Sequence, residues 1–172
     1  MTTTRLSTTE YAVLGVLAEG PSHGFAISKQ LDSTAELGRV FTVRRPLVYR
    51  ALDRLVESGY AEAVSTEKGD AGPKRVIHRI TRPGRRRLDL WLTEPALHVR
   101  DLRIEFLLKL TFIRRYGDSP LELIRDQRTA LDQTLSALDE ARSEPDDHVE
   151  LWRQHNAIAT AGYLEDLERL YS

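Results

Sequence analysis

Residues 42–60 read TVRRPLVYRALDRLVESGY and have the pattern of a helix with a basic N-terminal end. Its apolar residues recur at the spacing i, i+3, i+4 and i+7: Val48, Ala51, Leu52 and Leu55. That spacing is typical of one buried face of a helix. Pro46 suits the first helical turn, where the missing N–H has no partner anyway, and Gly59 suits the position just past the last turn. The stretch therefore predicts a short helix over residues 45–58 that buries one side.

The N-terminal end of this predicted helix is basic and carries a tyrosine. Arg44 and Arg45 come first, and Tyr49 and Arg50 follow one turn later. The macrodipole makes a helix N-terminus positive, so two arginines there are unfavourable unless an anion binds. Guanidinium and phenol groups contact phosphates and base edges when a helix enters a DNA major groove. The alternatives are that Tyr49 flanks the core and that Arg50, like Arg54, forms only surface ion pairs with Asp53 or Glu57.

The net charge of −1 hides an uneven distribution of charge along the chain. Residues 39–87 hold 13 Lys and Arg against 5 Asp and Glu, a net +8, whereas residues 96–172 hold 10 against 15, a net −5. A basic region inside a nearly neutral chain predicts a localised surface that binds anions, nucleic acid among them. The alternative is a solvated, arginine-rich surface without a partner.

The composition indicates a protein with a hydrophobic core and no membrane span. Apolar residues make up 41% of the 172 residues. No apolar run approaches the roughly 18 residues of a spanning helix. The N-terminal stretch lacks the pattern of a signal peptide. The chain has no cysteine, which excludes disulfides, a thiolate nucleophile and cysteine-bound metal, and we expect a cytoplasmic protein.

The segment before the basic helix predicts two further helices. Ser7 and Glu10 match the capping box at a helix start, and the Gly-Pro pair at residues 20–21 ends that helix. Ser22 is expected to cap a second helix, from which a loop with Gly38 leads on to the basic helix.

After residue 59 the pattern changes from helix to strand. Residues 60–66 and 74–80 have the composition of strands, and a polar loop with glycine and proline joins them. This predicts a hairpin with Lys74 and Arg75 close to its tip. A helix follows, with three large apolar residues on one face: Leu88, Trp91 and Leu92.

Residues 96–172 have a helical pattern throughout. Residues 100–115 are strongly apolar, residues 144–146 form a turn, and the last helix runs to the C-terminus. The helix after residue 120 has the 3-4 spacing of a coiled-coil seam, with Arg128 at its one polar position. The apolar seam residues are Leu121, Ile124, Leu131, Leu135 and Leu138. A nearly continuous helix near residues 95–100 is expected to join this part to the first.

Three helices followed by a hairpin predict a fold that is mostly α with a small β wing. We expect a winged helix-turn-helix DNA-binding domain over residues 1–95. An antiparallel, coiled-coil-like helical dimerisation domain is expected to follow over residues 96–172. Its apolar faces exceed what this half can bury alone, so a second subunit would cover them. The alternative is a monomer in which the two halves fold on each other.

Three blocks of the sequence, in their order and spacing, resemble the PadR-like family of transcriptional regulators. They are LSTTEYAVLGVLAEGPSHGFAISKQL at 6–31, LVYRALDRLVESGYAE at 47–62 and HRITRPGRRRLDLWL at 78–92. The C-terminal helices resemble, more loosely, the longer C-terminal domain found in one branch of that family. The resemblance implies a homodimeric repressor that binds double-stranded DNA at an inverted repeat in a promoter.

The resemblance also implies which residues contact DNA. The basic start of the recognition helix corresponds to Arg44 and Arg45, and the family's tyrosine corresponds to Tyr49. Lys74 and Arg75 correspond to basic wing residues that reach phosphates or the adjacent minor groove. To this set the basic helix adds Arg50. Many members have a small hydroxyl residue two places before the tyrosine, where this chain has Leu47, so no hydroxyl contact is expected there.

The same resemblance implies a small, often aromatic effector that releases the repressor from DNA. Four aromatic residues are candidates to line its pocket where the two halves meet: Trp91, Phe106, Trp152 and Tyr163. The alternative is that these side chains belong to the hydrophobic cores, as large aromatics at helical spacing usually do.

Enzyme motifs are missing from the sequence. It has no GxSxG element and no phosphate-binding glycine loop, and no two of its five histidines have the i, i+4 spacing of a helical metal pair. We therefore expect no catalytic residue, no metal and no cofactor. The function predicted is a DNA-binding repressor released by an effector. The alternatives are an activator, a winged-helix protein-interaction module without DNA binding, and a helical enzyme.

Overall fold

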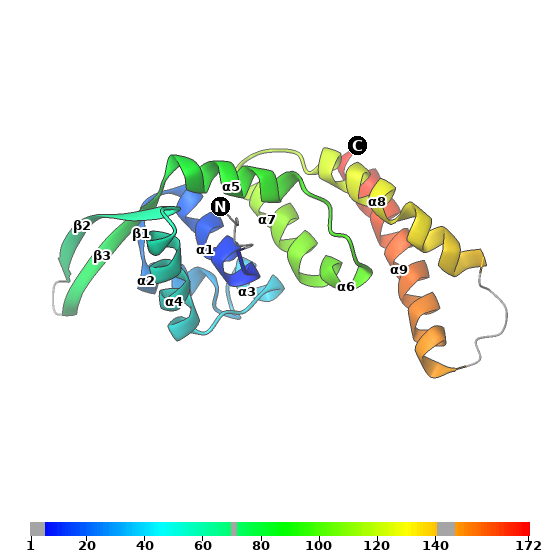
Figure 1. Cartoon of the computed structure of the whole chain (residues 1–172), viewed down its shortest axis with the longest axis horizontal. Helices are drawn as coiled ribbons and strands as arrows, with labels where there is room; N and C mark the ends of the chain where they lie inside the picture. The colour runs from blue at the N-terminus through cyan, green and yellow to red at the C-terminus, as the bar shows by residue number, and fades with distance from the viewer. Residues whose placement is uncertain (1–5, 70–71, 141–146) are drawn as a thin grey trace. The chain divides into compact units, whose positions relative to one another are not determined.

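The computed structural model of the protein describes residues 6–69, 72–140 and 147–172. The chain folds into two compact units, Met1–Leu92 and Thr93–Ser172 (Figure 1). Both are built mainly from helices, and the first also contains a small antiparallel sheet. The predicted fold class, mostly α with a small β wing in the N-terminal half and helices in the C-terminal half, is confirmed.

The first unit carries helices before and after a hairpin (Figure 1). In chain order its elements are α1 (Thr8–Glu19), β1 (Ser22–His23), α2 (Gly24–Gln30), α3 (Glu36–Val40), α4 (Arg45–Glu57), β2 (Ala61–Gly69), β3 (Gly72–Ile80) and α5 (Arg82–Thr93), whose last residue already belongs to the second unit. The sheet order is β1-β3-β2, with β3 in the centre.

Helix α1 begins with the predicted capping box. The backbone N of Ser7 donates to Glu10 Oε2 at 2.6 Å, and the backbone N of Glu10 donates to Ser7 Oγ at 3.3 Å. These two bonds use N–H groups that a helix start leaves without partners. The helix is buried on nearly all sides, because eight consecutive residues, 10–17, are buried.

Helix α4 buries the stripe that the sequence predicts. Val48, Leu52 and Leu55 are at most 1% exposed, and each such side chain contributes about 1.5–3 kcal/mol on leaving water. The helix packs on α1 and α2, which leaves its other side and its N-terminal end exposed. Its bounds confirm the predicted helix to within one residue at the C-terminal end.

Two predictions for the segment before α4 are wrong: the helix cap at Ser22 and the loop around Gly38. Ser22 does not cap a helix, because Ser22 and His23 extend along β3 and pair with His78 and Ile77. His23 caps α2 instead, and its Nδ1 accepts a hydrogen bond from the backbone N of Ala26 at 3.0 Å.

The predicted loop around Gly38 is the helix α3. A Cβ at Gly38 would lie 1.7 Å from the carbonyl oxygen of Asp32, so the glycine permits two backbones to approach closely. It does not mark a turn.

The hairpin is longer than predicted. Strand β2 pairs with β3 from Ala61, opposite Ile80, to Gly69, opposite Gly72. The pairing shifts between Ala63 and Ser65, and such a bulge bends a strand. Residues 70–71 at the predicted tip lie outside the described residues.

Helix α5 returns along α1 and closes the core of the first unit. The predicted face, Leu88, Trp91 and Leu92, is buried. The ring of Trp91 stacks on Tyr11 with 4.5 Å between ring centres.

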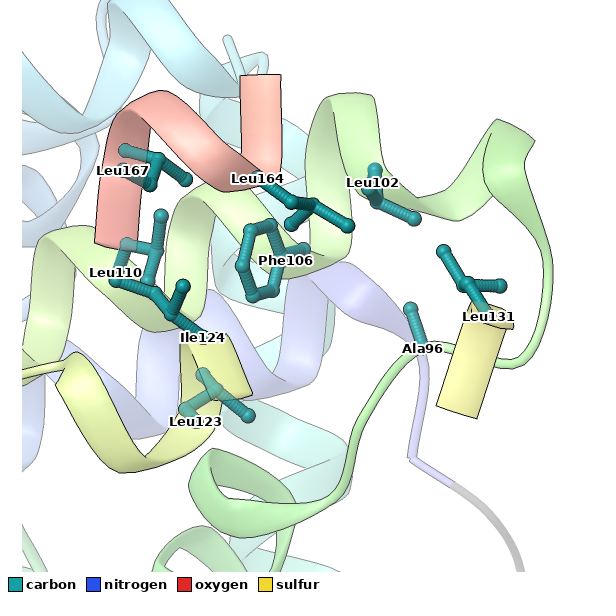
Figure 2. Close-up of a cluster of buried hydrophobic side chains, with 9 residues drawn as sticks. All are labelled: Ala96, Leu102, Phe106, Leu110, Leu123, Ile124, Leu131, Leu164 and Leu167. Atoms are coloured by element: carbon teal, nitrogen blue, oxygen red, sulfur yellow. The ribbon is translucent and has the colours of Figure 1, made fainter. Parts of the chain in front are cut away.

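The second unit is a helical bundle (Figure 1). Its elements are α6 (Val99–Asp101), the π-helical turn η1 (Leu102–Phe106), α7 (Leu107–Arg115), α8 (Leu121–Glu140) and α9 (His148–Tyr171). Helices α8 and α9 run antiparallel side by side. Figure 2 shows the buried cluster of this unit, with Phe106 surrounded by leucines from α7, α8 and α9.

The second unit corrects two predictions and leaves part of a third untested. Residues 94–98 are not helical, so the prediction of a nearly continuous helix near residues 95–100 is wrong.

In α8 the inward polar residue is Gln127, which is fully buried, whereas Arg128 is exposed and pairs with Glu168 at 2.9 Å. Of the predicted seam, Ile124 and Leu131 are buried. The side chains of Leu135 and Leu138 and the turn at residues 144–146 lie outside what the structure describes.

Candidate nucleic-acid interface

A cleft of about 470 Å³ lies in the first unit between the start of α4, the β1–α2 junction and the wing strand β3. Ten residues line it: His23, Gly24, Phe25, Arg45, Tyr49, Asp53, Lys74, Arg75, Val76 and His78. Three of them are cations and one is an anion, so the cleft has a positive charge. A negatively charged ligand therefore gains from entering it.

Four of the six predicted DNA-binding residues meet in this cleft. Helix α4 contributes Arg45 and, one turn later, Tyr49, while β3 contributes Lys74 and Arg75. All four side chains are exposed. The fold therefore brings together two groups that are about 30 residues apart in the sequence, because the hairpin folds back beside α4.

The other two predicted residues lie outside the cleft. Arg44 is the N-cap residue of α4, is exposed, and makes no side-chain hydrogen bond to the helix. Arg50 lines a smaller hollow of about 150 Å³ between α4 and the start of α1. Leu47 lines the same hollow and is 43% exposed, so it does not belong to the core.

Arg54 belongs to the hollow that Arg50 lines. Its Nη1 lies 3.9 Å from Glu10 Oε1, so its ion pair reaches back to α1. The surface pairing considered from the sequence involved neighbours on α4 instead.

Phe25 and Gly24 at the β1–α2 junction contact two of the predicted DNA-binding residues, Arg45 and Tyr49. The guanidinium carbon of Arg45 lies 4.7 Å from the centre of the Phe25 ring, a cation–π contact. The ring of Tyr49 packs over Gly24, where an added Cβ would lie 2.6 Å from Tyr49 Cε1. Tyr49 nevertheless stays 45% exposed, so its ring has one packed face and one free side.

His78 is a half-buried titratable group in the cleft. Burial lowers its pKa, and this effect is opposed by a hydrogen bond with the backbone of Val76 and by the charge of Asp53. Its Nδ1 is buried without a hydrogen-bond partner.

Sequence reasoning missed the contribution of His23, Gly24, Phe25 and His78. The SHGF segment at residues 22–25 suggests a purely structural role, and His78 suggests a strand residue without a role at the site. No local signal identifies Gly24 and Phe25, because their contacts are with Tyr49 and Arg45 on α4, which are not near them in the sequence.

Two arginines of the run at residues 85–87 pack against α1 and do not belong to a solvated helix face. Arg85 Nη2 donates to the carbonyl oxygen of Ala18 at 2.7 Å, and the guanidinium of Arg87 lies 5.6 Å from the ring centre of Tyr11. Both side chains fix α5 to α1, and only Arg86 is exposed.

The four candidate effector residues fall into two groups. Trp91 and Phe106 are at most 2% exposed and belong to the cores of the first and second units respectively. Trp152 and Tyr163, both on α9, are 64% and 38% exposed. The effector site stays a prediction.

The residues that the structure describes lack the features of a metal site and of a membrane-spanning helix. Within them, no group of three or more His, Cys, Asp or Glu residues is arranged to hold a metal ion. No helix among them combines the length and the apolar character needed to cross a membrane.

The arrangement of α2, α4 and the hairpin defines the class of the first unit. It is a winged helix-turn-helix domain, with α4 as the recognition helix and β2–β3 as the wing. The model of the family described as "Transcriptional regulator PadR-like family" matches residues 13–90, which lie entirely in this unit. Residues 13–90 are thus similar to the PadR-like family, which is described as a family of transcriptional regulators.

Solved structures similar to the chain include members of the same family. PadR of Bacillus subtilis in complex with operator DNA is 23% identical, with 95% of this chain and 97% of that chain covered and a TM-score of 0.49. The same protein in complex with p-coumaric acid is 22% identical, with 95% of each chain covered and a TM-score of 0.44.

A transcriptional regulator from Clostridium thermocellum is 26% identical over 48% of this chain and 74% of that chain, with a TM-score of 0.39. No curated protein sequence matches the chain.

Proposed function

We propose that the chain is a sequence-specific DNA-binding transcriptional regulator that represses its promoter until a small-molecule effector releases it. The observation that carries this proposal is the cleft between recognition helix and wing, in which Arg45, Tyr49, Lys74 and Arg75 converge. Cations on a recognition helix and on its wing are the groups that neutralise phosphates on either side of a groove.

Each predicted contact residue has a role in this proposal. Arg44 and Arg45 at the start of α4 enter the major groove, where a guanidinium binds a guanine edge or a phosphate with two hydrogen bonds. The hydroxyl of Tyr49 donates a hydrogen bond to a backbone phosphate. Lys74 and Arg75 follow the neighbouring phosphates along the wing.

Arg50 binds a phosphate beyond the cleft, on the side of α4 that faces the start of α1. Its place in the smaller hollow separates it from the four residues that meet in the cleft. The domain over residues 1–95 is the DNA-binding part of the protein in this account.

The helical region over residues 96–172 forms the homodimer. Helix α9 supports this role, because it exposes large apolar side chains that a monomer would leave in water. Those at least 44% exposed are Val149, Leu151, Trp152, Ile158 and Leu170. Two copies related by a twofold axis would place two recognition helices about 34–36 Å apart, one turn of the duplex, which matches an inverted repeat. Such a regulator acts on DNA in the cytoplasm.

An effector of small aromatic character is the proposed releasing ligand. A ligand shifts such a regulator only through a difference in affinity between its DNA-bound and free states. Trp152 and Tyr163 are the exposed members of the predicted set and are the residues to replace first.

Selection from a random-sequence pool of DNA duplexes tests the function and identifies the operator sequence in the same experiment. The proposal expects the wild-type protein to enrich a recurring inverted repeat, and the Arg45→Ala, Lys74→Ala double variant to enrich none. A pool that stays random after repeated rounds with the wild-type protein would overturn the proposal in favour of a protein-interaction module.

A further inference from the structure

Phe25 occupies an unusual place for a large apolar side chain. It is the second residue of α2, is 36% exposed, and lines the cleft without belonging to the core. Core burial therefore does not explain why an aromatic ring stands at this position. Its contacts are with charged and aromatic side chains at the surface.

The ring of Phe25 is a platform for cations. The guanidinium of Arg45 lies 4.7 Å from the ring centre, and Lys29 Nζ lies 5.7 Å from it. The imidazole of His23 stacks at 6.3 Å between ring centres, with an angle of 23° between the planes. Of the two cations, Arg45 is the closer, and it is the one that also lines the cleft.

A guanidinium that stacks on a ring keeps its hydrogen-bonding edge free. The contact uses the flat face of the group, while its five N–H donors point outward in the plane. An exposed arginine without such a contact samples many rotamers and loses that freedom when it binds. Stacking on Phe25 therefore orders Arg45 before any ligand arrives.

The platform itself is held in place from three sides. His23 is paired with Ile77 in the wing strand β3, and its Nδ1 caps the first turn of α2. Gly24, between the two aromatic residues, is covered by the ring of Tyr49 from α4. The junction at residues 23–25 thus ties together the wing, the helix α2 and the recognition helix.

We propose that Phe25 is a positioning residue for DNA recognition: it orients the guanidinium of Arg45 so that the free edge faces the DNA. Phe25 acts through Arg45 and not by its own contact with DNA. This inference rests on the proposed function, because it assigns Phe25 a task within that DNA-binding cleft.

A double-mutant cycle between Phe25 and Arg45 tests the inference. The probe is the duplex recovered by selection from the random pool, and the measurement is its dissociation constant from fluorescence anisotropy. Phe25→Leu is expected to weaken binding about two- to fivefold for each winged helix that binds. Phe25→Tyr, which keeps a ring, is expected to bind as the wild type does. In the Arg45→Ala background, Phe25→Leu is expected to cause no further loss.

Two controls separate positioning from a general effect on the fold. Val56→Ala removes an apolar side chain of similar exposure, 38%, near the other end of α4, and is expected to leave affinity unchanged. Lys29→Ala removes the second cation on the ring and is expected to leave the coupling between Phe25 and Arg45 intact.

The outcomes distinguish this inference from the proposed function. If Arg45→Ala weakens binding but Phe25→Leu weakens it equally in both backgrounds, Phe25 does not act through Arg45 and the inference is wrong, while the DNA-binding function stands. If Phe25→Leu leaves the affinity unchanged, the inference is also wrong. If the selection yields no recurring duplex, the proposed function fails, and the inference fails with it.

Discussion

The side-chain amide of Gln127 bonds both backbone polar groups of Ala96. Gln127 Nε2 donates to the Ala96 oxygen at 2.8 Å, and the Ala96 nitrogen donates to Gln127 Oε1 at 2.6 Å. Both residues are buried, so neither backbone group has water as an alternative partner. Helix α8 thereby holds the non-helical segment between α5 and α6 inside the second unit.

Replacing Gln127 by leucine is expected to destabilise the protein strongly. Gln127→Leu keeps a similar volume but leaves a buried N–H and a buried C=O without partners, at a cost of about 2–4 kcal/mol in the free energy of unfolding. Urea denaturation measures the loss. Asp126→Asn, an exposed change one residue earlier, is the matched control and should unfold like the wild type. A leucine variant as stable as the control would show that these two bonds carry little of the stability.

Lys109 is expected to be the most sensitive ion-pair residue of the second unit. Its ammonium is fully buried, lies 3.0 Å from Glu105 Oε1, and donates to the carbonyl oxygen of Glu94 at 2.6 Å. Lys109→Ala would leave a partly buried carboxylate without this partner, and removal of one member of a buried pair costs about 3–5 kcal/mol.

The exposed pair between Arg128 and Glu168 provides the comparison for Lys109. Thermal unfolding should show a much smaller loss for Arg128→Ala, because a surface pair is screened by water. Equal losses from the two variants would contradict the importance of burial.

Gly24→Ala is expected to separate DNA affinity from stability. The added methyl would lie 2.6 Å from Tyr49 Cε1, so the ring of Tyr49 must move away from its present position. Because Tyr49 is 45% exposed and its ring has room to move, the melting temperature should change little while affinity for the selected duplex falls. In a Tyr49→Ala background the same change should have almost no effect on affinity. A large loss of melting temperature would indicate instead that the glycine serves the fold.

His78 is expected to make the protein less stable in mild acid. Burial lowers its pKa below the ordinary value of 6.5, so the unfolded chain takes up this proton at a higher pH than the folded one. Stability contributed by neutral His78 is therefore complete above the ordinary value and is lost as the pH falls through the lower, folded-state pKa. Denaturation at a series of pH values should show a shallower decline below pH 6.5 for His78→Gln. Parallel curves for the two proteins would exclude this role.

The recognition helix could be predicted because its signals are local. The buried stripe from Val48 to Leu55, the proline at its start and the glycine past its end all lie within one short segment. The same holds for the capping box at Ser7 and Glu10. Such patterns depend on neighbours three or four residues away, which the sequence shows directly.

What the sequence did not show depends on distant partners. Two residues, Ser22 and His23, form a strand only because β3 lies beside them, and a segment that short has no period of its own. Gly38 permits a close approach to Asp32 that cannot be told from a turn without coordinates. Gln127 replaces Arg128 as the inward polar residue because its partner is the Ala96 backbone, about 30 residues earlier in the chain.

The candidate site was predictable in part for the same reason. The basic start of the helix predicted Arg45 as a contact residue, and the family resemblance predicted Lys74 and Arg75 on the wing. The platform at Phe25 was missed, because the contact between its ring and Arg45 joins two helices that are separated by α3.

The most direct test of the central claim is the salt dependence of DNA binding by the cleft. Fluorescence anisotropy would compare the wild type with the Arg45→Ala, Lys74→Ala, Arg75→Ala variant on the selected duplex and on a scrambled one. We predict that the wild type prefers the selected duplex and weakens steeply with salt. The triple variant should lose the preference and show a shallower slope, by about 0.9 for each phosphate contact removed. Equal binding to both duplexes, with one slope for both proteins, would contradict the account.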